Sequence, residues 1–385
     1  MSAGALDGLR VLDLTRYIPG PYATMMLADL GADVVKVEPK DGDPTRFLPP
    51  VVGEESAAHA ALNRGKRSVA VDLRTDEGAG VVRRLAERAD VLVEAFRPGV
   101  LARRGLGAPA LLEANPRLVY CSLTGYGQDG PYVDRAGHDI DYAALGGFLG
   151  SNQDAEGRPV VPKTQLADMT AGLVVVIGVL AALQARERTG RGQHVDVSLL
   201  RATLATMTLP LTRALADGGP ADELTGAFAC YGVYPCRDGR SVAVGALEPK
   251  FWESLCRALE APELAGAQWT TGQRRVQARA AVASRFAARD RDDWLRALAD
   301  EDVCVEPVLD LAEVASHPAA AGAFWDQPAG GSRLRTVAPP VRFSGTPGPE
   351  ARPSPALGEH TQDVLAEAGF TRGDIKKMRG AGVLA

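Results

Sequence analysis

The chain has 385 residues, of which 46% are apolar and 24% are charged, and its formal net charge is −5. This composition is typical of a soluble globular protein, and the length allows two domains with separate hydrophobic cores. An acidic net charge argues against a general nucleic-acid binder, whose binding surface would be basic.

The positions of the cysteines and the apolar segments further limit the possible class of protein. The five cysteines are scattered, without a CxxC pair or a histidine spacing suited to zinc, so we expect reduced thiols and no metal site. The N-terminus lacks the basic and apolar segments of a signal peptide. The most apolar run, residues 171–183, is shorter than the ~20 residues that span a bilayer. We therefore expect a cytoplasmic protein with no membrane or nucleic-acid partner.

Alternating strands and helices are predicted in the first half of the chain. Helix-like stretches at 22–32 and 77–89 separate some of the strands, which predicts a mainly parallel, Rossmann-like sheet covered on both faces. Ligands of such sheets usually bind beyond the carboxyl ends of the strands. A GxGxxG turn, a GxxxxGK[ST] loop and a GxSxG elbow are all absent from the sequence. The predicted strands are β-branched runs at 9–14, 33–38, 68–73, 90–95 and 118–123.

The second half predicts a smaller α+β domain. Residues 168–185 predict a long buried helix, and 194–200 predict a strand or the start of another helix. ADGGPADE at 216–223 predicts a link, and a hairpin with Asp238-Gly239 at its turn follows. Further helices are expected at 249–260, 276–299 and 360–380, with an extended strap at 338–358. We expect a large α/β domain at 1–215, a small α+β domain at 216–328, and a segment at 329–385 that returns to the large domain.

Four acid–base candidates stand at predicted helix starts, where a structural role is the simpler interpretation. His138 and Asp139 lie between glycines in RAGHDIDYAALGG, and aspartate is a common helix-start residue. Asp168 precedes the most apolar segment, so it either complements a helix dipole or exchanges protons in a partly dry pocket. Glu248 precedes Pro249, and it either caps a helix or orients an imidazole.

Basic side chains flank two of the predicted strands. Arg64, Lys66 and Arg67 lie in a turn before one strand, and Arg97 follows the next. Charged turns are usually just solvated. Beside parallel strands, however, such groups are able to hold phosphates together with helix N-termini.

Long motifs in a fixed order resemble those of the family III coenzyme A transferases, and within that family the α-methylacyl-CoA racemases. The resemblance covers nearly the whole chain. Racemases of the family carry a His-Asp pair in the setting AGHDINY, where this chain has AGHDIDY, and an acid that matches Glu248. The motifs are GLRVLDLTRYIPGPYATMMLADLGADVVKVEPKDGDPTR, NRGKRSVAVDL, EAFRPGVLARRGLG, LVYCSLTGYGQDGPY and TGRGQHVDVSLL.

The resemblance implies an isomerase that inverts the 2-methyl centre of branched acyl-CoA thioesters through an enolate. His138 and Asp168 would be the two bases, and the Asp139 backbone N–H would hold the thioester oxygen. Glu248 would orient His138 from the partner chain, because family members resemble interlocked homodimers. CoA would be part of the substrate, and no other cofactor is implied.

The resemblance also suggests how the CoA phosphates are held. The candidates are Arg97, Lys66 and Arg64. Many relatives read KxERP where this chain has Lys36-Val37-Glu38-Pro39-Lys40, so Lys40 would replace the family's arginine at the nucleotide, beside Lys36.

Two other functions are also compatible with the sequence. The first is an acyl-CoA:carboxylate CoA-transferase, in which Asp168 matches the family's covalent nucleophile. The second is a non-catalytic CoA-binding or scaffold protein with the same fold.

Overall fold

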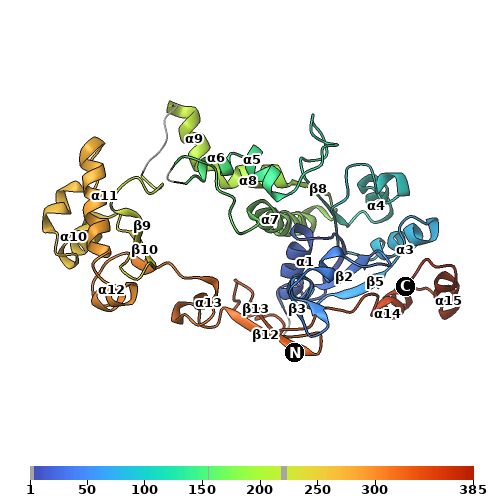
Figure 1. Ribbon diagram of the computed structural model, residues 1–385. Coiled ribbons are helices and arrows are strands. Elements are labelled where there is room, and N and C mark those ends of the chain that lie inside the picture. The colour runs from blue at the N-terminus through green and yellow to red at the C-terminus, as the bar shows by residue number, and fades with distance from the viewer. Residues whose placement is uncertain (1–3, 155, 218–222) are drawn as a thin grey trace. The chain divides into compact units, whose positions relative to one another are not determined.

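The computed structural model describes residues 4–154, 156–217 and 223–385, and the chain forms two compact units (Figure 1). The first unit comprises residues 1–207 and 322–385, and the second comprises residues 208–321. The link expected at 216–223 lies largely outside the described residues.

The unit boundaries differ by a few residues from the expected positions, 215/216 and 328/329. Helix α9 (Thr208–Asp217), expected in the large domain, groups with the second unit. Strand β12 (Phe324–Ala329), expected in the small domain, groups with the first because it forms a hairpin with β13 (Ser332–Val337).

A six-stranded parallel sheet forms the centre of the first unit. Its strand order is β5-β2-β1-β6-β7-β8, and every neighbouring pair is parallel. Counted along the chain within this sheet, the order is that of the doubly wound dinucleotide-binding fold, which confirms the Rossmann-like prediction. The strands are β1 (Arg10–Leu14), β2 (Asp33–Glu38), β5 (Arg67–Ala70), β6 (Val91–Glu94), β7 (Val119–Thr124) and β8 (His194–Ser198).

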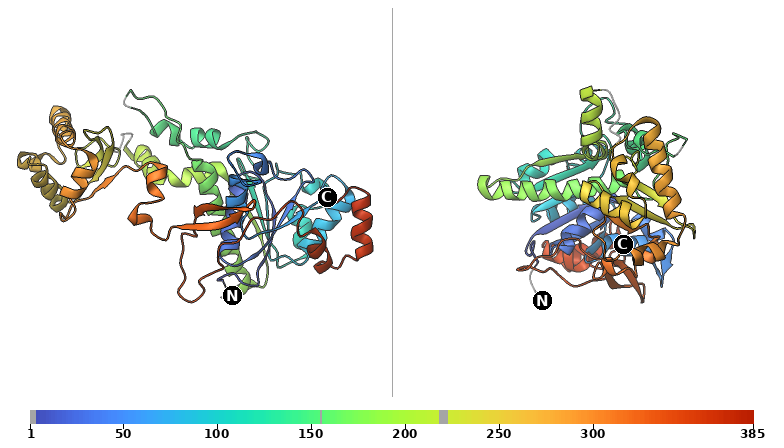
Figure 2. Two further views of the ribbon diagram at one scale, coloured as in Figure 1. Left: turned by 60° about the horizontal axis from the view of Figure 1, so that its bottom comes forward. Right: turned by 90° about the vertical axis from the view of Figure 1, so that its left-hand side faces the viewer.

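Helices cover both faces of this sheet because successive strand residues point to opposite faces. In β1, Val11 packs on the face covered by α1 (Pro19–Asp29) and α7 (Leu166–Thr189), and Leu12 packs on the other face. Figure 2 shows the sheet between these helix layers. The helices on the Leu12 face are α3 (Asp76–Ala86), α4 (Ala108–Ala114), α14 (Thr361–Glu367) and α15 (Arg372–Gly380).

The smaller elements of the first unit are η1 (Pro44–Phe47), β3 (Val51–Val52), β4 (Glu55–Ser56), α2 (Ala57–Asn63), η2 (Ala102–Arg104), α5 (Asp139–Leu145), α6 (Phe148–Ser151) and α8 (Leu199–Thr206).

Helix α7 is longer than the sequence predicts, with 24 residues from Leu166 to Thr189. Among the described residues it is the one helix long and apolar enough to cross a membrane. Val175 and Val179 are nevertheless fully buried in the core of the first unit, and 44% of the helix's most apolar window is buried.

The second unit has a three-stranded antiparallel sheet, with the expected turn at Asp238-Gly239. The helix expected at 276–299 is divided in two because Asp290 adopts an extended backbone and binds Arg237. Buried Trp252 and Phe286 join helices and sheet in one core. The elements are β9 (Tyr231–Pro235), β10 (Ser241–Gly245), α10 (Pro249–Ala258), η3 (Pro262–Ala267), α11 (Gly272–Phe286), α12 (Arg291–Ala297), β11 (Val305–Pro307), α13 (Leu311–Val314) and η4 (Pro318–Ala320).

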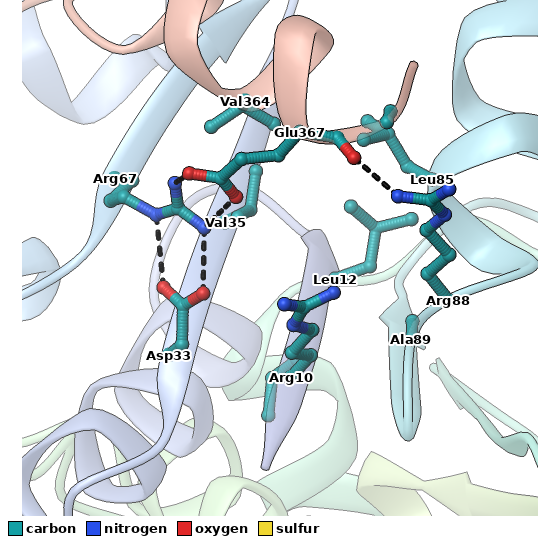
Figure 3. Close-up of a pocket in the computed structure, with 12 residues that line it drawn as sticks. Arg10, Leu12, Asp33, Val35, Arg67, Leu85, Arg88, Ala89, Val364 and Glu367 are labelled. Atoms are coloured by element: carbon teal, nitrogen blue, oxygen red, sulfur yellow. Dashed lines mark hydrogen bonds and ion pairs between the residues drawn. The ribbon is translucent and has the colours of Figure 1, made fainter. Parts of the chain in front are cut away.

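The C-terminal helices belong to the first unit and pack against its sheet. Gly369, with φ +90°, lies between α14 and α15, where the sequence predicted one helical segment. Figure 3 shows Arg67 of β5 between two carboxylates, Asp33 of β2 at 2.6 Å and Glu367 of α14 at 2.9 Å. Arg88 also donates to the Glu367 backbone carbonyl. These contacts join α14 to the amino edge of the sheet.

A buried charge cluster lies at the opposite, carboxyl edge. Asp13, Lys36 and Lys66 have no exposed side-chain surface. Lys66 Nζ lies 3.0 Å from Asp13 Oδ2, and Lys36 Nζ lies 2.9 Å from Asp43 Oδ2. Burial favours the neutral form of Asp13, but the charges of Lys66 and Lys36 outweigh it and hold the pKa of Asp13 well below its usual range. Burial lowers the pKa of Lys66 to about 8, so Lys66 is still mainly protonated at neutral pH and the Lys66–Asp13 pair is ionised there.

Replacing Lys66 by methionine should destabilise the protein by about 3–5 kcal/mol, because it leaves the Asp13 carboxylate buried without its nearest cation. The measurement is urea unfolding of the variant and the wild type. Arg74→Met is the control, since it removes an ion pair in which Arg74 is 83% exposed, and its unfolding midpoint should not move. Equal midpoints for the two variants would contradict the structural role of the cluster.

Candidate functional site

A cleft of roughly 550 Å³ opens at the carboxyl ends of β1, β6 and β7. Strand order reverses between β1 and β6, so this is the position where doubly wound sheets usually bind ligands. Segments that follow these strands line the cleft together with the loop before α5 and the first turn of α7. The lining includes Arg16, Arg97, Tyr126, His138, Tyr142 and Asp168.

His138 is the N-cap residue of α5, with an extended backbone at φ −124° and ψ 175°. Its side chain makes no capping hydrogen bond in the described structure. Its backbone N–H instead donates to Asp141 Oδ2 at 2.9 Å. Because the His138 side chain makes none of the hydrogen bonds at this helix start, the exposed imidazole is free to face the cleft.

Asp139, the first residue of α5, caps a different helix. Its Oδ1 accepts a hydrogen bond from the backbone N–H of Asp168 at 3.0 Å. Asp168 is in the first turn of α7, and the N-cap of that helix, Gln165, provides no side-chain cap. The Asp139 carboxylate therefore satisfies one of the free N–H groups of α7. This contact also brings the two acids together.

Asp168 is half-buried in the cleft, and its pKa is raised to about 6. Burial is the main cause, and the negative charge of Asp139 raises the pKa further, while His138 acts in the opposite direction. A carboxyl group with this pKa exists in both protonation states near neutral pH. The predicted bases His138 and Asp168 thus line one cleft, with Asp139 beside them.

Arginines line the mouth of the cleft. Arg97, a predicted phosphate ligand, follows β6 and is exposed there. Arg16 follows β1, and its guanidinium lies 5.7 Å from the ring centre of Tyr17 and 5.9 Å from that of Phe96. Arg16 was not predicted as a ligand from the sequence, although it follows its strand just as Arg97 does. Both cations are available to an anionic ligand.

The other predicted phosphate ligands are bound to the protein itself. Lys36 and Lys66 belong to the buried charge cluster, and we assign them to stability of the sheet edge. Arg64 is 4% exposed and makes two hydrogen bonds to the Asp29 carboxylate, at 2.6 and 3.0 Å. Lys40 is exposed and donates to the backbone carbonyl of Gly382. A phosphate contact by Arg64 or Lys66 would require its ion pair to open.

Glu248 belongs to the second unit. It is the exposed N-cap residue of α10, and its side chain makes no capping hydrogen bond among the described residues. The capping interpretation of its carboxylate is therefore not supported, and its role as an orienting group stays a prediction.

A second polar cavity adjoins the cleft, since Arg97 and Pro98 line both. Burial raises the pKa of Glu94 in this cavity to about 7. Ser122 Oγ lies 3.0 Å from His194 Nε2 in the same cavity. In the described parts of the chain, no group of three or more His, Cys, Asp or Glu side chains is arranged to hold a metal ion.

Comparison with known proteins identifies relatives over nearly the full chain. The model of CoA-transferase family III matches residues 6–361. The α-methylacyl-CoA racemase of Mus musculus is 36% identical over 389 residues, which cover 97% of this chain and 96% of that protein. The succinyl-CoA:glutarate CoA-transferase of Mus musculus is 35% identical over 394 residues, which cover 98% of this chain and 90% of that protein.

A solved structure is also similar. The crystal structure of a CAIB/BAIF family protein from Brucella suis matches with a TM-score of 0.84 and 34% identity, over 96% of this chain and all of that chain. The identities to a racemase and to a transferase are nearly equal. Overall similarity therefore does not separate the two activities.

Asp139→Asn should lower the pKa of Asp168 by on the order of one unit, because it removes a neighbouring negative charge but keeps an acceptor for the Asp168 N–H. The measurement is an infrared titration of the Asp168 carboxylic-acid band, which is identified by its loss in the Asp168→Asn variant. Asp141→Asn is the matched control, since it removes a charge from the same helix turn without this contact. The interpretation fails if both variants shift the titration equally.

Proposed function

Because the chain belongs to CoA-transferase family III, a family of racemases and CoA-transferases that act on acyl-CoA, we propose that it is an α-methylacyl-CoA racemase. The reaction would invert the 2-methyl centre of a branched acyl-CoA by moving the α-proton through an enolate. The observation that supports this proposal most is Asp168, with a pKa of about 6, in the same cleft as His138.

The chemistry requires one proton acceptor and one proton donor, on opposite faces of a planar enolate. The thioester acidifies the α-carbon enough for ordinary side chains to remove its proton. A carboxyl group with a pKa near 6 is able to accept a proton in one direction and return it in the other. His138 would be the second group. An aspartate with an ordinary pKa would be protonated too rarely at neutral pH to act as the donor.

The negative charge of the enolate also needs a donor. The Asp139 backbone N–H is at the first position of α5, where helix N–H groups have no partner within their helix. We assign it to the thioester oxygen. Helix α5 has only seven residues, so the direct hydrogen bond would contribute more than the helix dipole.

CoA would be bound as part of the substrate, and the mechanism requires no further cofactor. Arg97 and Arg16 are exposed cations that line the cleft, as is Arg135, and we assign Arg97 and Arg16 to the CoA phosphates. Binding energy from the long CoA moiety would align the reacting carbon between the two bases.

The alternative function is transfer of CoA between carboxylates, with Asp168 as the covalent nucleophile. The similarity to succinyl-CoA:glutarate CoA-transferase supports it. A nucleophilic carboxylate has to be ionised, so a raised pKa makes Asp168 less suited to this role below about pH 6.

In D₂O, the wild-type protein should introduce deuterium at the α-carbon of a 2-methylacyl-CoA without any second carboxylate. His138→Ala and Asp168→Ala should each slow overall inversion by about 10²–10⁴-fold, because each removes one of the two proton-transfer groups. The exchange is followed by mass spectrometry, with His194→Ala as a control that should retain activity. A transferase would instead need a carboxylate acceptor and form an enzyme thioester that hydroxylamine traps.

We further propose a homodimer in which Glu248 orients His138 of the other subunit. A heterodimer of a Glu248→Ala chain and a His138→Ala chain should then contain one intact site and recover about half of the wild-type inversion rate. Each mutant homodimer is the control. If the purified heterodimer is as inactive as both homodimers, Glu248 does not act across subunits.

A further inference from the structure

The peptide group between Gly137 and His138 is held at both ends by the first turn of α5. Its carbonyl oxygen accepts a hydrogen bond from Tyr142 Oη at 2.8 Å. Its N–H donates to Asp141 Oδ2 at 2.9 Å. This peptide is directly joined to the His138 Cα, from which the imidazole projects. Two adjacent helix residues thus fix the plane that carries His138.

Close packing holds the Tyr142 ring against this peptide. The ring is 5% exposed and contacts Tyr126 edge to face, with 5.2 Å between ring centres. A Cβ atom added at Gly125 would lie 2.5 Å from Tyr142 Oη, and one added at Gly137 would lie 2.9 Å from it. A side chain at either position would therefore force the Tyr142 ring or the neighbouring backbone to shift. Burial raises the pKa of Tyr142 to about 12, so the hydroxyl remains a donor throughout the neutral range.

We propose that Tyr142 and Asp141 are positioning residues for His138, which hold its backbone so that the imidazole meets the substrate α-carbon. Rotation of the 137–138 peptide would swing the imidazole, and a misplacement of about 1 Å costs on the order of 10²-fold in rate. The catalytic part of this inference rests on the proposed racemase function. The conformational part depends only on the two hydrogen bonds.

The conformational part is tested by histidine NMR, which needs no substrate. The chain has five histidines, so labelling at Cε1 gives five signals, and His138→Ala identifies the one from His138. Tyr142→Phe should move, split or broaden that signal because it removes only the hydroxyl. Tyr120→Phe is the matched control, since Tyr120 is also buried and donates to a backbone carbonyl, that of Leu106 at 3.1 Å.

Asp141 provides a second pair of variants for the same measurement. Asp141→Asn keeps an oxygen acceptor for the His138 N–H, whereas Asp141→Ala removes it. The His138 signal should be disturbed in Asp141→Ala and retained in Asp141→Asn. A His138 signal unchanged in both Tyr142→Phe and Asp141→Ala would overturn the inference, whatever the protein catalyses.

The catalytic part is tested by deuterium exchange from each enantiomer of a 2-methylacyl-CoA separately. His138→Ala identifies the enantiomer whose proton His138 removes, because exchange from that enantiomer is lost. Tyr142→Phe should slow exchange from this enantiomer by on the order of 10–100-fold, with KM nearly unchanged, and should affect the other enantiomer much less. Tyr120→Phe should match the wild type for both.

The outcomes separate the two hypotheses. Absence of exchange in the wild type would refute the racemase function, and the NMR result would still decide whether Tyr142 positions His138. Wild-type exchange with an equal loss for both enantiomers in Tyr142→Phe would assign Tyr142 to general stability and overturn the inference. A loss confined to the His138 enantiomer would support it.

Discussion

The buried charge cluster at the carboxyl edge of the sheet constrains the wall of the cleft. Asp13 Oδ1 accepts from the backbone N–H of Thr15 at 2.9 Å, and Lys36 Nζ donates to the Thr15 carbonyl at 2.9 Å. These bonds fix the backbone two residues before Tyr17. Tyr17 has φ +66°, a conformation unfavourable for a side chain of this size. Buried charges are costly unless paired, so the cluster holds this turn in one conformation. Arg16 is presented at the cleft mouth as a result.

The N-terminus of α7 affects both the stability of this helix and the chemistry of Asp168. The N-terminus of α7 needs acceptors for its free N–H groups, and Asp139 supplies one. Its charge then lies beside Asp168, where burial already disfavours ionisation. The positive helix end and His138 act in the opposite direction. A racemase needs both protonation states of this carboxyl group, whereas a transferase needs the ionised one, so the balance of these local charges bears directly on which chemistry the shared fold performs.

Five of the six strands could be predicted from the sequence because β1, β2, β5, β6 and β7 are short apolar runs that are largely buried. Strand β8 begins with exposed residues, and its segment also fitted the start of a helix. Boundaries that depend on single residues could not be predicted, such as the break before α12 at Asp290 or the turn at Gly369. Charged residues near strand ends were the least predictable. Lys66 and Arg97 are both basic residues beside predicted strands, yet Lys66 is fully buried against Asp13 and Arg97 is exposed in the cleft. Only three-dimensional pairing distinguishes them.

The two acids in the first turn of α5 show that a capping role and a role in catalysis do not exclude each other. Asp139 and Asp141 are ordinary helix-start residues by sequence, and both do accept backbone hydrogen bonds. The donors, however, are the backbone N–H groups of Asp168 and His138, the two proposed bases. A capping hydrogen bond is short and directional, so it locates its donor as firmly as it stabilises the helix. The hydrogen bonds that satisfy these free backbone N–H groups therefore also hold the two proposed bases in one cleft.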